Sequence, residues 1–198
     1  MQKLLIATSN PGKFNEIMEV ISDLPFEFLS LKDVEVDYSD LKEDGESFYE
    51  NSFIKAKYFR DKTGYLTLAE DSGILVDALT GELGVKTRRW GAGENASDDE
   101  WMSFFMERMM NEENRAASFV CNACVLGNDY REHFEGETKG VLMKEIMAPI
   151  IPGIPLSSCF VAEGCDKVYA LMNEAEKNMV SHRGKAMHKL KVFLQSIA

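Results

Sequence analysis

Three polar segments of the sequence combine residue types that bind phosphate groups and metal ions. The first, Thr8-Ser9-Asn10-Pro11-Gly12-Lys13, follows an apolar run and opens an amphipathic segment. A helix that starts here would point free amides and the positive end of its dipole at an anion. Gly12 permits close approach and Lys13 adds a charge. The spacing is not that of a Walker A loop, and the alternative is an ordinary helix start capped by Asn10.

The second segment is acidic. Glu70-Asp71-Ser72-Gly73 follows the apolar strand candidate Leu66–Ala69, and loops at strand ends often carry chemistry. Two adjacent carboxylates there could hold Mg²⁺, a hard cation that prefers carboxylate and phosphate oxygens. The run Glu43-Asp44-Gly45-Glu46 could supply a third carboxylate. The alternative is a solvated acidic turn.

The third segment is cationic and lies near the carboxyl end of the chain. His182 and Arg183 stand at the start of the last predicted helix, with Ser181 as its cap and Lys177 shortly before it. Cations at a helix N-terminus oppose the helix dipole, and an anionic or carbonyl-rich ligand would offset that cost. Arg89 adds a further cation. Singly, each could be a surface charge, but together with the acidic loop they predict a nucleoside polyphosphate site.

Composition limits the possible partners. The chain has 198 residues, 45% of them apolar, which predicts one well-buried domain over residues 1–198. The formal net charge of −11 repels polyanions, so we expect no nucleic acid polymer as a partner. A single nucleotide in a local basic pocket is compatible with that charge.

The compartment follows from the cysteines and the apolar runs. Met1–Lys13 lacks the features of a signal peptide, and prolines interrupt the apolar stretch Ile146–Ile154, so we expect no membrane span. Cys121 and Cys124 form a CxxC inside a predicted strand, where residues three apart face opposite sides. They are therefore expected to be core thiols in a reducing cytoplasm rather than zinc ligands.

Helices and strands alternate in the pattern that must position these segments. We expect strands at 3–7, 26–31, 66–69, 74–79, 118–127, 130–137 and 140–145, and helices at 11–21, 47–60, about 98–110 and 183–196. Strands alternate with helices in the first part of the chain, and consecutive strands that suggest antiparallel hairpins follow in the later part. This order predicts an α/β fold with a mixed sheet.

The same segments, in this order, resemble the pyrophosphatases that hydrolyse inosine and xanthosine triphosphates and their deoxy forms. Residues 8–16 are similar to the family's T-x-N-x-x-K-x-x-E, and residues 43–51 to its E-T-G-x-T-F-x-E-N. Further matches are 69–79 to A-D-D-S-G-L-x-V-D-A-L, 84–90 to G-x-x-S-A-R-Y, 115–121 to R-x-A-x-F-x-C, 176–178 to E-K-N and 181–184 to S-H-R-G. These matches run through nearly the whole chain.

The resemblance implies an elongated mixed β-sheet flanked by helices, with the substrate cleft between two lobes, in a homodimer. It implies Mg²⁺-dependent hydrolysis of ITP, dITP and XTP to the monophosphate and pyrophosphate, which cleanses the nucleotide pool. Asp71 would be the general base on water and a metal ligand, with Glu43 and Glu70 as the other metal carboxylates. The implied substrate-binding residues are Thr8, Ser9, Asn10, Pro11, Gly12, Lys13, Ser72, Arg89, Ser157, Lys177, His182 and Arg183. The guanidinium of Arg183 only donates hydrogen bonds, so it would donate to the O6 of hypoxanthine or xanthine. It would disfavour adenine, whose 6-amino group is itself a donor.

One segment departs from the family pattern. Where the family has G-F-G-Y-D-P-x-F, this chain has residues 153–160, with Ile154 for the aromatic that stacks on the base, Leu156 for the tyrosine and Ser157 for the aspartate. A lost stacking ring costs about 1–3 kcal/mol of binding. The preferred base is therefore left open. Two alternatives follow: a pyrophosphatase with altered base specificity, and a nucleotide-binding protein without turnover.

Overall fold

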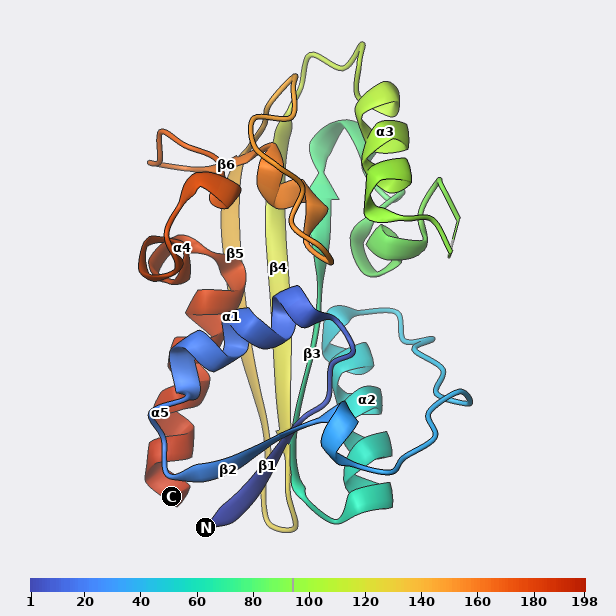
Figure 1. The fold of residues 1–198 in the computed structure, drawn as a ribbon. Helices are drawn as coiled ribbons and strands as arrows, with labels where there is room; N and C mark the ends of the chain where they lie inside the picture. The colour runs from blue at the N-terminus through green and yellow to red at the C-terminus, as the bar shows by residue number, and fades with distance from the viewer. Residues whose placement is uncertain (94) are drawn as a thin grey trace.

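The fold is built on one mixed sheet with the strand order β2-β1-β3-β4-β5-β6 (Figure 1). The computed structural model describes residues 1–93 and 95–198, apart from the side chain of Arg89. The strands are β1 (Gln2–Ile6), β2 (Phe26–Ser30), β3 (Leu66–Val76), β4 (Ala116–Leu126), β5 (Arg131–Leu142) and β6 (Phe160–Ala162). β1 runs parallel to β2 and β3, and the other pairings are antiparallel. The mixed α/β sheet predicted from the sequence is confirmed.

Helices cover the sheet and connect its strands. The α-helices are α1 (Pro11–Ile21), α2 (Phe48–Thr63), α3 (Asp98–Arg108), α4 (Glu174–Val180) and α5 (His182–Ile197). Short 3₁₀ turns are η1 (Leu31–Asp33), η2 (Asp77–Leu79), η3 (Gly84–Arg89), η4 (Pro155–Ser158) and η5 (Tyr169–Leu171). The predicted caps Asn10 and Ser181 are confirmed, since each accepts a backbone N–H of its helix. Ser97 caps α3 in the same way, and Gly64 ends α2 with a φ of 71°.

Two predicted loops are instead strand. The acidic segment at 70–73 lies inside β3, which pairs with β4 continuously from Thr67 to Val76. Gly73 does not form a turn; it allows the backbone of η3 to approach β3 closely. A Cβ on it would lie 2.5 Å from the carbonyl oxygen of Gly84. The predicted break at 138–139 is likewise absent. Gly136, inside β5, lies against α5, where an added Cβ would fall 2.0 Å from the carbonyl oxygen of His182.

The end of β1 exposes an edge of β3. β1 pairs with β3 only at Leu4–Ile6 against Leu66–Leu68, and the chain then leaves the sheet towards α1. Within the described ranges, no strand pairs with the later part of β3 on that side. Glu70 and Asp71 follow at this uncovered edge, beside the carboxyl end of β1. That position is where open α/β sheets bind ligands.

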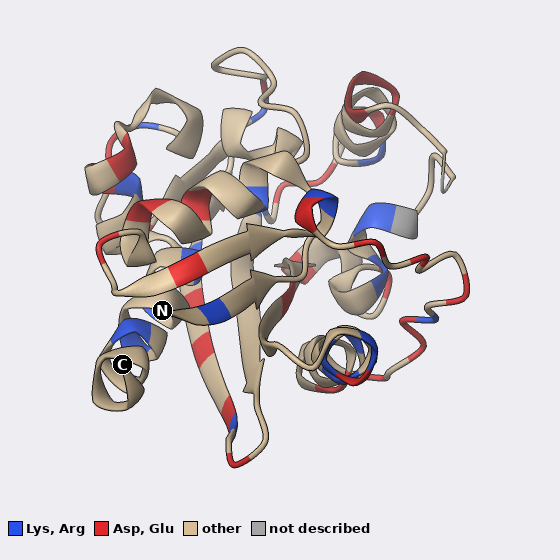
Figure 2. Ribbon diagram, turned by 60° about the horizontal axis from the view of Figure 1, so that its bottom comes forward, with Lys and Arg blue, Asp and Glu red and all other residues tan. Residues whose placement is uncertain are grey.

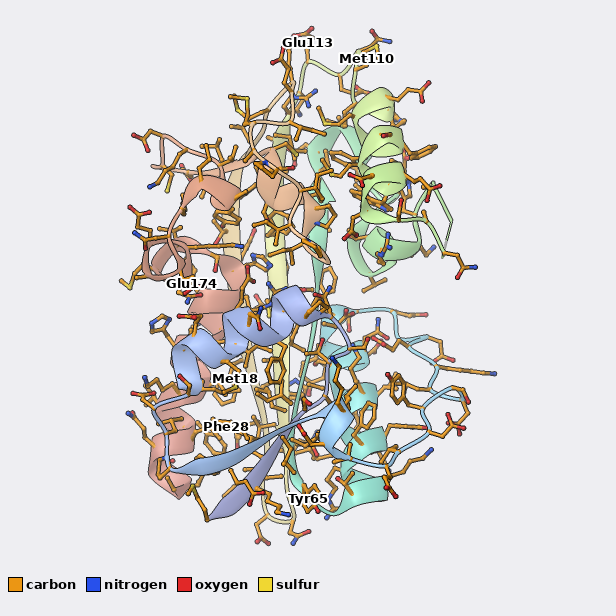
Figure 3. The ribbon with its side chains drawn as sticks, viewed as in Figure 1. Met18, Phe28, Tyr65, Met110, Glu113 and Glu174 are labelled. Atoms are coloured by element: carbon orange, nitrogen blue, oxygen red, sulfur yellow. The ribbon has the colours of Figure 1, made fainter. Side chains whose placement is uncertain are left out.

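Three apolar clusters hold the layers together. α1 and α5 pack on one face of the sheet around residues such as Ile6 and Leu190, while α2 packs on the other face around residues such as Leu5 and Phe59. The third cluster lies in the half of the molecule that carries α3, around residues such as Trp101. Met18 and Phe28 mark the first half in Figure 3, and Met110 and Glu113 mark the far end of the second.

The cysteines follow the sheet faces as predicted. Cys121 belongs to the cluster under α1 and α5, and Cys124 to the cluster under α2. Both thiols are free and buried, and burial raises the pKa of Cys124 to about 12.

The charges are spread over the surface. Acidic and basic residues are distributed over many helices, strands and loops, and the loop that leads from η1 to α2 is mainly acidic (Figure 2). No helix in the described part of the chain is long and apolar enough to cross a membrane.

Candidate active site

A cavity of about 560 Å³ lies between the two halves of the molecule. Its size is within the usual range for a small-molecule site. Of the residues predicted from the sequence, it is lined by Thr8, Ser9, Asn10, Pro11, Lys13, Glu43, Asp71, Ser72, Ser157, Lys177, His182 and Arg183. Gly12 and Glu70 lie behind this lining, in contact with residues that form it. Arg89 ends η3, and its side chain lies outside the described part of the structure.

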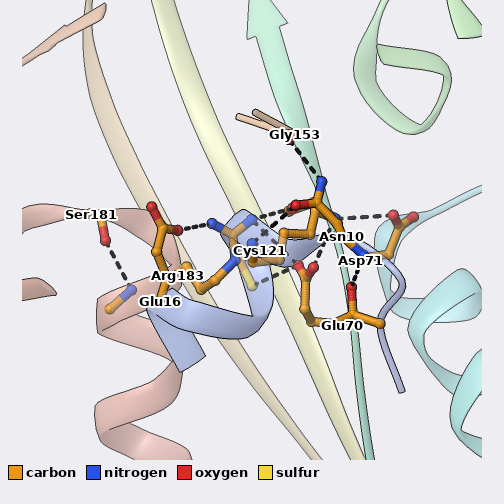
Figure 4. A network of polar contacts seen from close by, with 12 residues as sticks. Asn10, Glu16, Glu70, Asp71, Cys121, Gly153, Ser181 and Arg183 are labelled. Atoms are coloured by element: carbon orange, nitrogen blue, oxygen red, sulfur yellow. Dashed lines mark hydrogen bonds and ion pairs between the residues drawn. The ribbon is translucent and has the colours of Figure 1, made fainter. Parts of the chain in front are cut away.

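The amino end of α1 forms one wall of the cavity. The side chain of Asn10 caps the helix by accepting the N–H of Lys13 at 3.1 Å. Its other end donates to the carbonyl oxygen of Gly153 at 2.8 Å (Figure 4). Thr8 Oγ1 accepts the N–H of Asn10 at 3.2 Å, which tightens the turn between β1 and α1. This wall presents a helix N-terminus, two hydroxyls and an ammonium to the cavity, which suits a phosphate group.

Glu70 is a fully buried carboxylate held by cations. Lys13 Nζ lies 2.7 Å from its Oε1, and a guanidinium nitrogen of Arg183 lies 3.7 Å from its Oε2. Burial alone would raise the pKa of Glu70, but Lys13 and Arg183 bring it well below the usual range. Glu70 is therefore ionised and neutralises part of the cationic charge behind the cavity wall.

Asp71 points to the opposite face of β3, towards α2. Its Oδ2 accepts a hydrogen bond of 3.0 Å from the side-chain amide of Asn51, and its Oδ1 accepts the N–H of Ser72 at 3.0 Å. Burial raises the pKa of Asp71, and the nearby Lys13 and Lys55 oppose that rise. A carboxylate with a raised pKa that lines a cavity is a candidate acid or base.

Glu43 stands beside Asp71, on the loop before α2. Lys55 Nζ lies 2.6 Å from Glu43 Oε2 and 3.3 Å from the backbone carbonyl oxygen of Glu70. Burial lowers the pKa of Lys55, but Glu43 and Asp71 outweigh this and raise it. Lys55 therefore stays protonated and brings the two acidic segments together.

A second buried ion cluster lies at the start of α5. Glu16, on α1, pairs with both Lys177 and Arg183. Arg183 also donates from its other terminal nitrogen to Ser72 Oγ at 2.9 Å. Burial would raise the pKa of Glu16, but Arg183 and Lys177 lower it. The cations near the start of α5 are unfavourable towards its helix dipole, and their ion pairs with Glu16 of the neighbouring helix α1 offset that cost.

The part of the cavity towards α3 is mostly apolar. His182 stacks on Phe119 with ring centroids 4.7 Å apart, and burial followed by the charge of Arg183 lowers the pKa of His182 well below its usual range. Ile154 and Ser157 also line this part. The Ser157 hydroxyl donates to the carbonyl oxygen of Ile154 at 2.6 Å, so it is turned towards its own backbone.

The oxygen ligands at the cavity are of the type that a hard cation binds, but the carboxylates alone do not form a complete coordination shell. Glu43, Glu70 and Asp71 offer carboxylate oxygens, which Mg²⁺ prefers. Yet two of them face lysines, and among the described residues no group of three His, Cys, Asp or Glu side chains could hold a metal ion. Mg²⁺ is commonly held by one or two carboxylates together with substrate phosphates. The residues fit that arrangement.

Three polar residues that line the cavity were not predicted as site residues. Glu16, Asn51 and Lys55 line it and pair with predicted site residues. Asn51 and Lys55 are one helical turn apart, so they share a face of α2. Their spacing in the sequence could have indicated this, because polar residues at positions i and i+4 on the apolar face of a helix need hydrogen-bond partners when they are buried.

Comparison with known proteins agrees with the geometry. The profile of the Ham1 family matches residues 4–193. A dITP/XTP pyrophosphatase of Dictyoglomus thermophilum is 36% identical over 197 residues, covering 98% of this chain and 94% of that protein. A dITP/XTP pyrophosphatase of Geobacter sulfurreducens is 38% identical over 195 residues, with 96% of each chain covered.

Solved structures are similar as well. A HAM1 protein from Coxiella burnetii superposes with a TM-score of 0.84 at 30% identity, covering 99% of this chain and 100% of the other. The Ham1 protein of Staphylococcus aureus gives a TM-score of 0.82 at 28% identity, with both chains fully covered. The similarity spans both halves of the fold and the cavity between them.

Proposed function

The chain belongs to the Ham1 family, and we propose on that basis that its cavity hydrolyses non-canonical purine nucleoside triphosphates to the monophosphate and pyrophosphate. Substrates of this class are ITP, dITP and XTP, whose removal cleanses the nucleotide pool. The observation that carries the proposal is the position of Asp71, a cavity carboxylate of raised pKa, next to the phosphate-type wall at the amino end of α1.

Asp71 is the general base in this proposal. An ionised carboxylate can accept about four hydrogen bonds, and Asn51 and the N–H of Ser72 occupy two of these positions. A water molecule can occupy another and give its proton to Asp71. The water oxygen would attack the α-phosphorus, and the bond to the oxygen that bridges the α- and β-phosphorus atoms would break.

Cations of the cavity bind the triphosphate. Lys13, Lys177 and Arg183 lie on its lining together with Thr8, Ser9 and Asn10. Each of the three cations already faces a buried carboxylate, Glu70 or Glu16. These carboxylates hold the cations in place before substrate arrives, so that little ordering is needed on binding.

Glu43, Asp71 and Glu70 would hold Mg²⁺, which when bound would neutralise phosphate charge and make water easier to ionise. Of these three carboxylates, Glu43 and Asp71 line the cavity, and Glu70 stands behind the lining with Lys13. A shift of Lys13 or Lys55 towards the phosphates would free carboxylate oxygens for the cation.

Base recognition is assigned to the wall around His182 and Arg183. The Nε of Arg183 and the Nδ1 of His182 are buried, with no hydrogen-bond partner among the described residues. Nε is a donor and suits the O6 of hypoxanthine or xanthine. The aromatic and acidic residues of the family pattern are replaced by Ile154, Leu156 and Ser157 on the same wall. That replacement favours a second candidate, the same chemistry with altered base specificity.

The test is release of pyrophosphate from a panel of nucleoside triphosphates, with Mg²⁺ and with chelator. We expect turnover of ITP, dITP and XTP that requires Mg²⁺ and is lost in Asp71→Asn. A pyrimidine or other triphosphate with a higher kcat/KM would favour altered specificity. Tight binding without pyrophosphate from any triphosphate would favour a nucleotide-binding protein and contradict the enzyme.

We further propose that the protein is a homodimer that works in a reducing compartment such as the cytoplasm. An outward sheet face carries Leu75 and Val141, which are 46% and 48% exposed, and supports association of two copies. All four cysteines are free, which supports the reducing compartment. Light scattering of the purified protein would measure its mass, and a monomer at micromolar concentration would contradict the dimer.

A further inference from the structure

Gly153 bridges the amino ends of two helices on opposite sides of the cavity. Its N–H donates to Oδ2 of Asp98, the first residue of α3, at 2.6 Å. Its carbonyl oxygen accepts a hydrogen bond of 2.8 Å from the side-chain amide of Asn10, the cap of α1. One residue of the loop before η4 is therefore fastened both to the phosphate-type wall and to the half of the molecule that carries α3.

The loop is seated directly on the segment that precedes α1. Gly153 has a φ of +82°, and a Cβ on it would lie 2.4 Å from Asn10 Oδ1. A Cβ on Gly12 would lie 3.0 Å from the carbonyl oxygen of Pro152 and 3.2 Å from Ile154 Cγ1. The start of α1 contacts residues 152–154 on both sides of Gly153, so a displacement of one segment would require the other to move as well.

The residues that follow Gly153 form the base-side wall of the cavity. Ile154, Leu156 and Ser157 line it, and η4 is tied together by the bond of 3.1 Å from the N–H of Ser157 to the carbonyl oxygen of Ile154. Only Ile154 separates Gly153 from η4, and η4 is internally bonded. The two fixed contacts of Gly153 therefore anchor the start of this wall.

Asp98 is the acceptor that fixes this position from the α3 side. Its side chain is 21% exposed and its second oxygen lies 3.8 Å from a guanidinium nitrogen of Arg88, another residue of the cavity lining. Asp99, the next residue of α3, is exposed and shares the same helix dipole. The two neighbours thus differ in the bond to Gly153 and in the ion pair with Arg88, and Asp98→Asn separates these two contacts because it removes the charge and keeps an acceptor.

We propose that Asp98 is a positioning residue that sets base selectivity by holding the 153–157 segment over the nucleotide. The proposal rests on the proposed function, because selectivity is a property of the hydrolysed nucleotide. Asp98 is not among the residues that line the cavity, and it acts through Gly153 and the wall that follows it.

The experiment compares Asp98→Ala, Asp98→Asn and the matched control Asp99→Ala. The measured quantity is the ratio of kcat/KM between ITP and GTP. We expect Asp98→Ala to change this ratio about tenfold, the effect of losing one hydrogen bond to a charged group. Asp98→Asn keeps a carbonyl acceptor for the N–H of Gly153 and should stay within about twofold of the unsubstituted protein, as should Asp99→Ala. If Asp98→Ala does not fold, Asp98→Ser, whose side chain is too short to reach Gly153, takes its place.

Amide hydrogen exchange over residues 151–157 gives a readout independent of turnover. Exchange at Gly153 should be faster in Asp98→Ala than in Asp98→Asn or Asp99→Ala. An unchanged selectivity ratio, or unchanged exchange, in Asp98→Ala would overturn the inference. If the unsubstituted protein releases no pyrophosphate, the proposed function fails instead, and a faster Gly153 exchange in Asp98→Ala would still support the bond that Asp98 makes.

Discussion

The side-chain amide of Asn51 holds Asp71 with one end and the Glu43 loop with the other. Its nitrogen donates to Asp71 Oδ2 at 3.0 Å, and its oxygen accepts the N–H of Gly45 at 2.8 Å. Asn51 is 1% exposed and belongs to α2. One buried helical residue therefore holds Asp71 directly and holds the loop that carries Glu43 through Gly45, so two of the three proposed metal carboxylates depend on it.

Asn51→Ala should therefore lower kcat with the fold retained. Loss of a partner that orients a ligand or a catalytic group typically costs about 10–100-fold in activity or metal affinity. The rate of pyrophosphate release should be measured at several Mg²⁺ concentrations, beside Asn15→Ala, an exposed asparagine of α1. Activity equal to that of the control would contradict the orienting role.

The Glu16 cluster predicts a large loss of stability. In Glu16→Gln, Arg183 and Lys177 would keep their positions without the carboxylate that pairs with both of them. Removing one partner of a buried ion pair costs about 3–5 kcal/mol. Urea unfolding should show this decrease, whereas Glu19→Gln, exposed on the same helix, should change the free energy of unfolding by less than about 0.5 kcal/mol.

His182 predicts a dependence of stability on mildly acidic pH. Its pKa in the folded protein is well below the ordinary value of 6.5 because the ring is buried. Below about pH 6.5 the unfolded chain takes up a proton that the folded chain does not, so the free energy of unfolding should decrease by up to about 1.4 kcal/mol per pH unit as the pH falls.

Unfolding measured between about pH 6.5 and 5 should show a smaller slope in His182→Gln. The partly buried His133, whose pKa is also lowered by burial, accounts for some of the remaining slope. His188→Gln, on the exposed side of α5, serves as the control. Equal slopes in His182→Gln and the control would mean that His182 is protonated in the folded state.

Ile154→Phe should strengthen binding of purine nucleotides. Ile154 lines the base-side wall, and an aromatic ring there gives a stacking contact worth about 1–3 kcal/mol per base. We expect KM for ITP to fall by about tenfold or more. Ile154→Val, which adds no ring, is the matched control, and a KM that rises in Ile154→Phe would show that the base does not lie against this residue.

Local signals predicted α1, α2, α3 and α5 because capping chemistry is local, and Asn10 and Ser181 cap the helices expected of them. The short helix α4 was not predicted, although Asn173 and Glu176 form a capping box at its start. The polar residues of β3 misled the prediction. Glu70 and Asp71 look like a solvated turn until Lys13 and Asn51, which are distant in sequence, are seen to neutralise or bond them.

Glycine was the other source of error. Gly73 suggests a turn, yet it lies within β3, and Gly136 lies within β5, inside the predicted strand 130–137. At each of the two glycines another segment approaches too closely for a Cβ. The partners that require them, Gly84 and His182, belong to segments whose approach is a property of the tertiary fold. For the same reason the sequence could place Arg183 in the site but could not show that Glu16 and Ser72 already occupy its terminal nitrogens.

The strands β3, β4 and β5 serve both halves of the molecule at once. Leu68 of β3 belongs to the cluster beneath α1, and Ile74 of the same strand belongs to the cluster around Trp101. The halves are thus joined by three hydrogen-bonded strands, and widening the cavity means bending or twisting that ribbon. Any change in the width of the cavity therefore has to be taken up by the backbone of these paired strands, because the described structure joins the two halves through them.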